Sequence, residues 1–186
     1  LLLERRAHFA MFGGVRFGGT LGIESAFDTG FDHIALCAGA GKPTILDMKN
    51  GLARGVRAAS DFLMALQLTG AARDTSITNL QVRLPVVVIG GGLTAIDTAT
   101  ESMAYYPVQV EKFLARYEIL AAEKGDAVVR RAWGKEEAII ADEFIDHARL
   151  IRKEREPAKK EQRVPRVREL VDLWGGATMV YRRWMV

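Results

Sequence analysis

The sequence predicts an α/β fold, in which a strand, a glycine turn and a helix are followed by a helical insertion and a second strand. Three observations lead to this prediction. Residues 85–90, PVVVIG, are an uninterrupted β-branched run, which is typical of a buried strand. Residues 93–106 contain no helix breaker and follow three glycines, so a helix is expected there. Residues 177–184, ATMVYRRW, form a second strand-like run after a glycine pair.

Residues 1–43 are predicted to hold a short helix and two strands. An amphipathic helix is expected over residues 1–12, where a glycine pair then ends it, and a brief strand over 15–17. A turn-rich stretch follows. The run FDHIALCAGAG at 31–41 is short, apolar and closed by small residues, which favours a buried strand. We therefore expect Cys37, the single cysteine, to be a buried structural thiol.

Residues 44–84 are predicted to be a connecting helix and loop. Apolar side chains recur at intervals of three and four between residues 55 and 68, as they do on one face of a helix. Residues 107–174 are charged and have a helical period, which predicts two or three helices packed as a hairpin or small bundle. We place this helical insertion at about 107–170, inside a unit that spans 85–186.

The composition excludes several classes of protein. The 186 residues are 49% hydrophobic and 26% charged. These values argue against a disordered tail, a collagen-like repeat and a membrane bundle. We find no spanning segment and no export signal, and one cysteine suits a reducing compartment, so we expect a cytoplasmic protein without a membrane partner. The chain starts at Leu1 and not at Met, which suggests a piece of a longer protein.

Positive charge is concentrated in residues 149–168, which hold nine Lys and Arg against three Glu. Clustered cations favour nucleic-acid binding in general, but glutamates interleave here and the run has no aromatic residue to stack on bases. Nucleic acid is therefore disfavoured, and a solvated helix face or a dock for an acidic protein fits better. One alternative function follows: a non-enzymatic interaction module whose basic insertion binds an acidic protein or RNA.

The glycine turn after the first predicted strand has the pattern of a phosphate-binding loop. Gly90, Gly92 and Ala95 match GxGxxG/A between a strand and a helix. Gly90 would permit the tight turn, Gly92 would let a pyrophosphate approach the backbone, and Ala95 would let helix and strand pack closely. Amide groups at the helix start would then face the phosphates. A flexible strand exit would also produce a glycine triplet.

The second predicted strand ends in Arg182 and Arg183. An acidic residue that would bind the ribose of NAD is missing at the usual spacing. Paired guanidinium groups suit the 2′-phosphate of NADP, because they form charge-assisted forked hydrogen bonds. Two arginines on an exposed strand end are also common surface residues. Taken with the glycine turn, the pair favours NADP over NAD.

These residues carry a resemblance to a known family. VVVIGGGLTAIDTATES and ATMVYRRW resemble the NADPH-binding domain of the glutamate synthase small subunit and related FAD/NAD(P)-dependent pyridine nucleotide-disulfide oxidoreductases. FDHIALCAGAGKP and NGLARGVRAASDFLMA are similar to the segment that precedes that domain. The resemblance covers roughly residues 1–106 and 170–186. It implies a Rossmann-like dinucleotide-binding fold, here with a helical insertion.

The resemblance also implies two cofactors, FAD and NADPH, with hydride passing from the nicotinamide to the flavin. Residues 1–43 would be the C-terminal part of an FAD-domain-like segment, in which Ala38 and Gly39 lie near FAD at a strand end. A tight turn without a ligand explains those two residues equally well. The implied NADPH contacts are, for the pyrophosphate, Gly90, Gly91, Gly92, Thr94 and Ala95, and, for the 2′-phosphate, Arg182 and Arg183.

The sequence departs from the family pattern in three ways. Leu93 stands where relatives often have an acidic residue, the insertion replaces a short connection, and the first FAD-binding glycine motif is absent. We therefore expect FAD to be held mainly by FAD-binding and C-terminal domains or subunits outside this chain, and the fragment to be inactive alone. We predict no catalytic residue, and no metal site, since His8, His33 and His147 are far apart.

Overall fold

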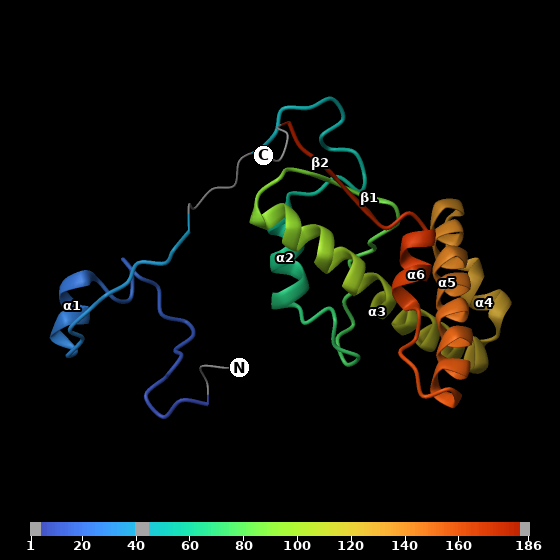
Figure 1. Cartoon of the computed structure of the whole chain (residues 1–186), viewed down its shortest axis with the longest axis horizontal. Helices are drawn as coiled ribbons and strands as arrows, with labels where there is room; N and C mark the ends of the chain where they lie inside the picture. Colours follow the sequence, from blue (N-terminus) through green and yellow to red (C-terminus); the bar gives the residue numbers. More distant parts are fainter. Residues whose placement is uncertain (1–4, 40–44, 183–186) are drawn as a thin grey trace. The chain divides into compact units, whose positions relative to one another are not determined.

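The computed structural model describes residues 5–39 and 45–182, and it divides into two compact units, Leu1–Pro43 and Thr44–Val186 (Figure 1). The first unit holds one described helix, α1, which spans Ile23–Asp28. The second unit holds the other described helices and both described strands. No helix among the described residues has the length and apolar character needed to cross a membrane. The candidate glycine turn therefore lies in the larger, mainly helical unit.

The first unit has little regular structure. Residues 5–12 form turns and irregular chain, so the predicted helix over 1–12 is wrong in its described part. In place of the predicted strand at 15–17 there is a single bridge from Phe17 to Leu21. Residues 31–39 are irregular as well, and Cys37 is exposed, so the predicted buried strand and buried thiol are wrong. An apolar run becomes a strand only when a neighbouring strand pairs with it.

Five described helices build the second unit, and the longest of them, α3, contacts each of the other four (Figure 1). Their bounds are α2 Ala59–Leu68, α3 Leu93–Lys124, α4 Asp126–Arg131, α5 Lys135–Lys160 and α6 Val167–Leu173. The helix predicted between residues 55 and 68 is thus present as α2. The helix predicted over 93–106 is present too, but it continues through Pro107 to Lys124.

The main hydrophobic core is formed mainly by helices, and seven of its fifteen buried residues lie in the segment predicted to be an insertion. It joins α2, α3, α5 and α6 with the irregular segment 71–82. Its largest fully buried side chains include Tyr105, Tyr106, Phe144 and Leu114. The helices at 107–170 are therefore the centre of this unit, rather than an addition to a sheet.

The sheet has two parallel strands, β1 Val86–Ile89 and β2 Ala177–Val180, among the residues described. Both strands lie inside the predicted runs, and α3 contacts them. A second, small cluster joins Val88 to Ala95 and Ala99 of α3. On the other side of β1, Val87 is 61% exposed. The strand is therefore buried on one face only, whereas its β-branched sequence predicted burial on both.

The predicted fold class is consequently wrong. A Rossmann-like α/β fold needs a parallel sheet of several strands with helices on both faces. The described chain is mostly helical and has only the two-stranded sheet. The sequence pattern identified a local strand–turn–helix–strand unit correctly, but that unit is attached to a helical core and does not belong to a larger described sheet.

Polar side chains of α3 satisfy the backbone of segment 71–82, which has no regular structure of its own. Tyr105 accepts a hydrogen bond from the Leu80 amide at 3.1 Å, and Gln109 both accepts from the Val82 amide and donates to the Val82 carbonyl. Arg116 donates to backbone carbonyls earlier in the same segment. This pairing lets an irregular segment enter the core, because buried amides and carbonyls are costly without partners.

His147 packs within a group of aromatic side chains, and this environment makes the stability of the fold depend on pH. The His147 ring stacks on Trp174 with 3.7 Å between centroids, and its Nδ1 lies 2.6 Å from the Tyr106 hydroxyl. Burial lowers the pKa of His147, although the nearby carboxylates of Glu143 and Asp146 act in the opposite direction. The unfolded chain therefore binds a proton at this histidine more readily than the folded chain does.

We expect the free energy of unfolding to fall as the pH drops below the unfolded histidine value of about 6.5. The loss should continue until the pH passes the lower folded pKa of His147. Urea unfolding at a series of pH values, followed by Trp fluorescence, measures it. The variant His147→Gln should flatten the pH dependence in this window, whereas His33→Gln, at an exposed position, should not. Equal behaviour of the two variants would contradict the prediction.

Candidate functional site

The glycine turn joins the carboxyl end of β1 to the start of α3. The Gly90 amide donates to the Val180 carbonyl at 2.9 Å, so the turn begins where the strand pairing ends. Gly90 has a φ of +145°, a conformation that side chains rarely adopt, and a Cβ there would lie 3.3 Å from the Cβ of Ala95. Ala95 is itself buried against Val88. The structure therefore shows the tight turn at Gly90 and the close packing at Ala95 that the motif predicts.

Gly92 is the open position of the turn. It is the N-cap of α3, with no side-chain hydrogen bond to the cap, and a Cβ placed on it would have no atom within 4 Å. The next two residues, Leu93 and Thr94, are exposed and begin the helix, where amides lack intrahelical acceptors. The backbone amides of these exposed residues therefore lie at the N-terminus of a 32-residue helix, where the helix dipole is positive. This arrangement suits an anion that approaches the backbone closely.

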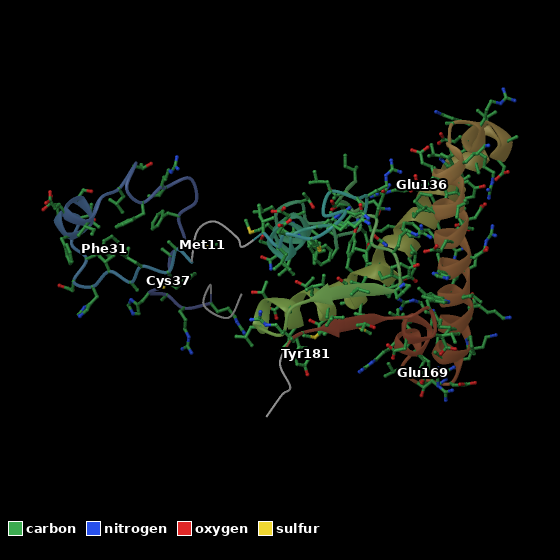
Figure 2. All side chains as sticks on the ribbon, turned by 90° about the horizontal axis from the view of Figure 1, so that it is seen from above. Met11, Phe31, Cys37, Glu136, Glu169 and Tyr181 are labelled. Carbon is green, nitrogen blue, oxygen red and sulfur yellow. The ribbon has the colours of Figure 1, made fainter. Side chains whose placement is uncertain are left out.

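The end of β2 lies beside this turn. The parallel register pairs Ile89 with Val180, so the residues that follow each strand leave from the same edge of the sheet. Tyr181, which follows β2 (Figure 2), packs against Gly91, where a Cβ would lie 3.2 Å from the Tyr181 Cβ. Arg182 follows and is exposed. The fold therefore brings Arg182 to the edge that carries the glycines, while Arg183 lies outside the described residues.

Ala38 and Gly39 belong to the first unit and lie in exposed, irregular chain. The strand expected before them is missing, so the reason for placing FAD at a strand end is wrong. Nothing in the described part of that unit forms a cradle around the two residues, and their contact with FAD stays a prediction. Leu93, which replaces an acidic residue of the family pattern, is 80% exposed.

The basic run 149–168 forms ion pairs within the chain. Each of its arginines has a carboxylate oxygen within 4.0 Å of a guanidinium nitrogen. Two of the pairs are bidentate and join α5 to α3, namely Arg152 with Glu118 and Arg155 with Glu111. This pairing leaves less unbalanced charge for an acidic protein or RNA than the composition suggests. Binding of either partner stays a prediction.

Sequence reasoning missed a second group of polar residues, on the core side of α3. Lys112 is only 8% exposed, and with Arg116 and Tyr117 it lines a cavity of about 320 Å³ beside segment 77–81. The sequence did hold a signal, since Gln109 and Lys112 lie among the apolar residues of a predicted helix. No group of three metal-ligating side chains occurs in the part of the chain that the structure describes.

Comparison with known proteins finds a relative of this chain. The chain is 44% identical over 182 residues to the uncharacterized protein RP006 of Rickettsia prowazekii (strain Madrid E). The match covers 98% of this chain but only 23% of that protein, so the chain spans about a quarter of its relative's length. No protein-family model matches the chain, and no solved structure matches it. The resemblance to the glutamate synthase small subunit therefore stays a prediction.

Proposed function

We propose that this chain is the NADPH-binding portion of a flavin-dependent oxidoreductase similar to the glutamate synthase small subunit. The observation that carries the proposal is the open turn at Gly92, beside the strand end that bears Arg182. A diphosphate at this turn would accept hydrogen bonds from backbone amides at the N-terminus of α3. Arg182, together with Arg183, would bind the 2′-phosphate that distinguishes NADPH from NADH.

The role proposed for the chain is to bind and orient the cofactor. When NADPH and FAD are both bound, the nicotinamide passes hydride to the flavin, and the protein sets the geometry of the transfer. The open turn at Gly92 supports a diphosphate site, whereas no feature of the described residues supports one for FAD. We propose that FAD is held mainly by protein outside these 186 residues, which agrees with the greater length of the relative. A cytoplasmic location is part of the same proposal.

Titration of the chain with NADPH and NADH tests this function. We expect micromolar NADPH binding that is tighter than NADH binding. The variant Arg182→Ala should weaken NADPH binding by about 10-fold or more, as expected for the loss of a hydrogen bond between charged groups, and should leave NADH binding unchanged. The variant Arg168→Ala is the matched control, because it removes an arginine from another exposed position, in α6.

Two results would overturn the proposal. One is a folded chain that binds neither nucleotide at millimolar concentration. The other is equal loss of NADPH binding in Arg182→Ala and Arg168→Ala, which would indicate a general effect of net charge. RNA binding that falls steeply with salt, without nucleotide binding, would favour the interaction module instead.

A further inference from the structure

The cavity beside α3 is separate from the glycine turn. Its volume is about 320 Å³, at the lower end of the range for small-molecule sites. Its walls come from the core-facing side of α3, from α4 with the loop after it, and from segment 77–81. All of these segments belong to the second unit. A cavity of this size suits a small molecule rather than a nucleotide.

One wall of the cavity is aromatic. The Trp133 ring lies 5.7 Å from the Tyr117 ring and 6.3 Å from the Phe113 ring, centroid to centroid. The guanidinium carbon of Arg130 lies over both Tyr117 and Trp133, at 5.4 and 5.5 Å from the ring centroids. A cation is attracted to the face of an aromatic ring, so Arg130 stabilises the arrangement of these two rings. The wall therefore offers a preformed apolar surface for a flat group.

The charge at the cavity is positive. The buried Lys112 ammonium donates to the Ala71 carbonyl at 2.6 Å and reaches the Thr78 carbonyl at 3.5 Å. Within residues 5–39 and 45–182, no carboxylate lies within 4.0 Å of Lys112 or Arg116. No residue that lines the cavity is acidic. A buried cation without a counter-ion is costly, and burial accordingly lowers the pKa of Lys112.

The nearest acidic groups do not neutralise the positive charge at the cavity. Asp126 accepts hydrogen bonds from Tyr117 and Arg130, so its charge is already matched. Asp74 raises the pKa of Lys112 only through a charge interaction without a hydrogen bond, and Arg116, which lines the same cavity, lowers it. An ammonium group has three donors, and the two carbonyls use two of them. An anion in the cavity would compensate the charge and accept the third hydrogen bond.

We infer that this cavity binds a small monocarboxylate with a flat apolar body, with the carboxylate at Lys112 and the flat group against Trp133. The cation sets the preference for an acid over its neutral analogue, and the aromatic wall sets the preference for a ring. The inference does not depend on NADPH binding, since the two sites share no residue.

Titration of the full chain with phenylacetate tests the inference, with phenylacetamide as the uncharged probe of nearly equal shape. We expect saturable binding of phenylacetate, seen as a change in Trp fluorescence, and at least about 10-fold weaker binding of phenylacetamide, as for the loss of a hydrogen bond to a charged group. Equal binding of the two compounds, or binding of neither to the folded chain, would overturn the inference.

The variant Lys112→Met identifies the residue responsible. It replaces the ammonium by an apolar group of similar length and should weaken phenylacetate binding at least about 10-fold. Lys153→Met, at an exposed position of α5, is the matched control and should bind as the original chain does. If Lys112→Met does not fold, the variant Leu120→Trp tests the inference instead. Leu120 lines the cavity and is partly exposed, so a larger side chain there should block phenylacetate from entering. Unchanged affinity in the folded Lys112→Met or Leu120→Trp variant would contradict the inference.

Discussion

The variant Gly92→Ala is expected to bind NADPH at least about 100-fold more weakly than the original chain, which corresponds to about 2.7 kcal/mol. The added methyl group would occupy the space through which the diphosphate reaches the backbone amides, and more than one charge-assisted hydrogen bond would be lost. The protein itself should tolerate the change, because Gly92 has an ordinary φ of −88° and open space around its Cβ position. Isothermal titration calorimetry measures the affinity, and thermal unfolding checks the fold.

Gly134→Ala is a matched control for this substitution. Gly134 is also the N-cap of a helix, α5, and has a comparable φ of −68°. Alanine at this position should reproduce any general effect of replacing a capping glycine, while leaving NADPH binding unchanged. If Gly92→Ala binds NADPH as tightly as Gly134→Ala does, the diphosphate does not approach the backbone at this turn.

The variant Phe144→Ala is expected to destabilise the second unit by about 3–5 kcal/mol, the usual loss for a large aromatic residue in a core. Phe144 is 1% exposed, and its ring packs edge-on against Tyr106 and Phe113 at centroid distances of 6.1 and 5.8 Å. It lies in the segment predicted to be an insertion. Urea unfolding followed by Trp fluorescence measures the change.

The matching strand variant is Val87→Ala. Val87 lies in β1 but is 61% exposed, so its truncation should change the free energy of unfolding by less than about 0.5 kcal/mol. The two variants together distinguish a helical core from a core built around the sheet. A larger loss for Val87→Ala than for Phe144→Ala would contradict the described packing.

The strand positions could be predicted from sequence because β-branched runs favour extended backbone wherever they pack. Their burial could not, since it depends on how many neighbours cover the sheet. Val88 is buried against α3, while Val87 and Ile89, with the same residue preferences, face outward. The error was therefore to infer a multi-stranded α/β fold from one strand that was expected to be buried. A local sequence pattern does not show how many strands a sheet contains.

For the helices, too, some features could be predicted from sequence and others could not. The helix expected over 93–106 continues through Pro107, although proline lacks the amide donor of the helix interior, and Pro107 is buried within α3 beside buried Tyr105 and Tyr106. Burial of the proline ring in the core helps to offset the lost hydrogen bond. At the other extreme, residues 31–39 have a strand-like composition but no described strand partner, and they remain irregular.

The local geometry of the glycine turn was predicted better than the fold, while cofactor binding at the turn stays a prediction. The conformation of Gly90, the open position of Gly92 and the contact of Ala95 with the strand all depend on local geometry, which a short motif determines. The position of Arg182 at the same edge depends only on the two strands being parallel neighbours. The cavity at Lys112 was missed because it needs three segments that are distant in the sequence to meet.

The most direct test of the proposed site is a titration of the ¹⁵N-labelled chain with NADP⁺, followed through the backbone amide resonances. We expect saturable shifts of the amide resonances of Gly91, Gly92, Leu93 and Thr94. The shifts should be smaller when NAD⁺ is used at the same concentration. Saturable shifts confined to other parts of the chain, or no shifts at millimolar NADP⁺ in the folded protein, would contradict binding of a dinucleotide diphosphate at the glycine turn.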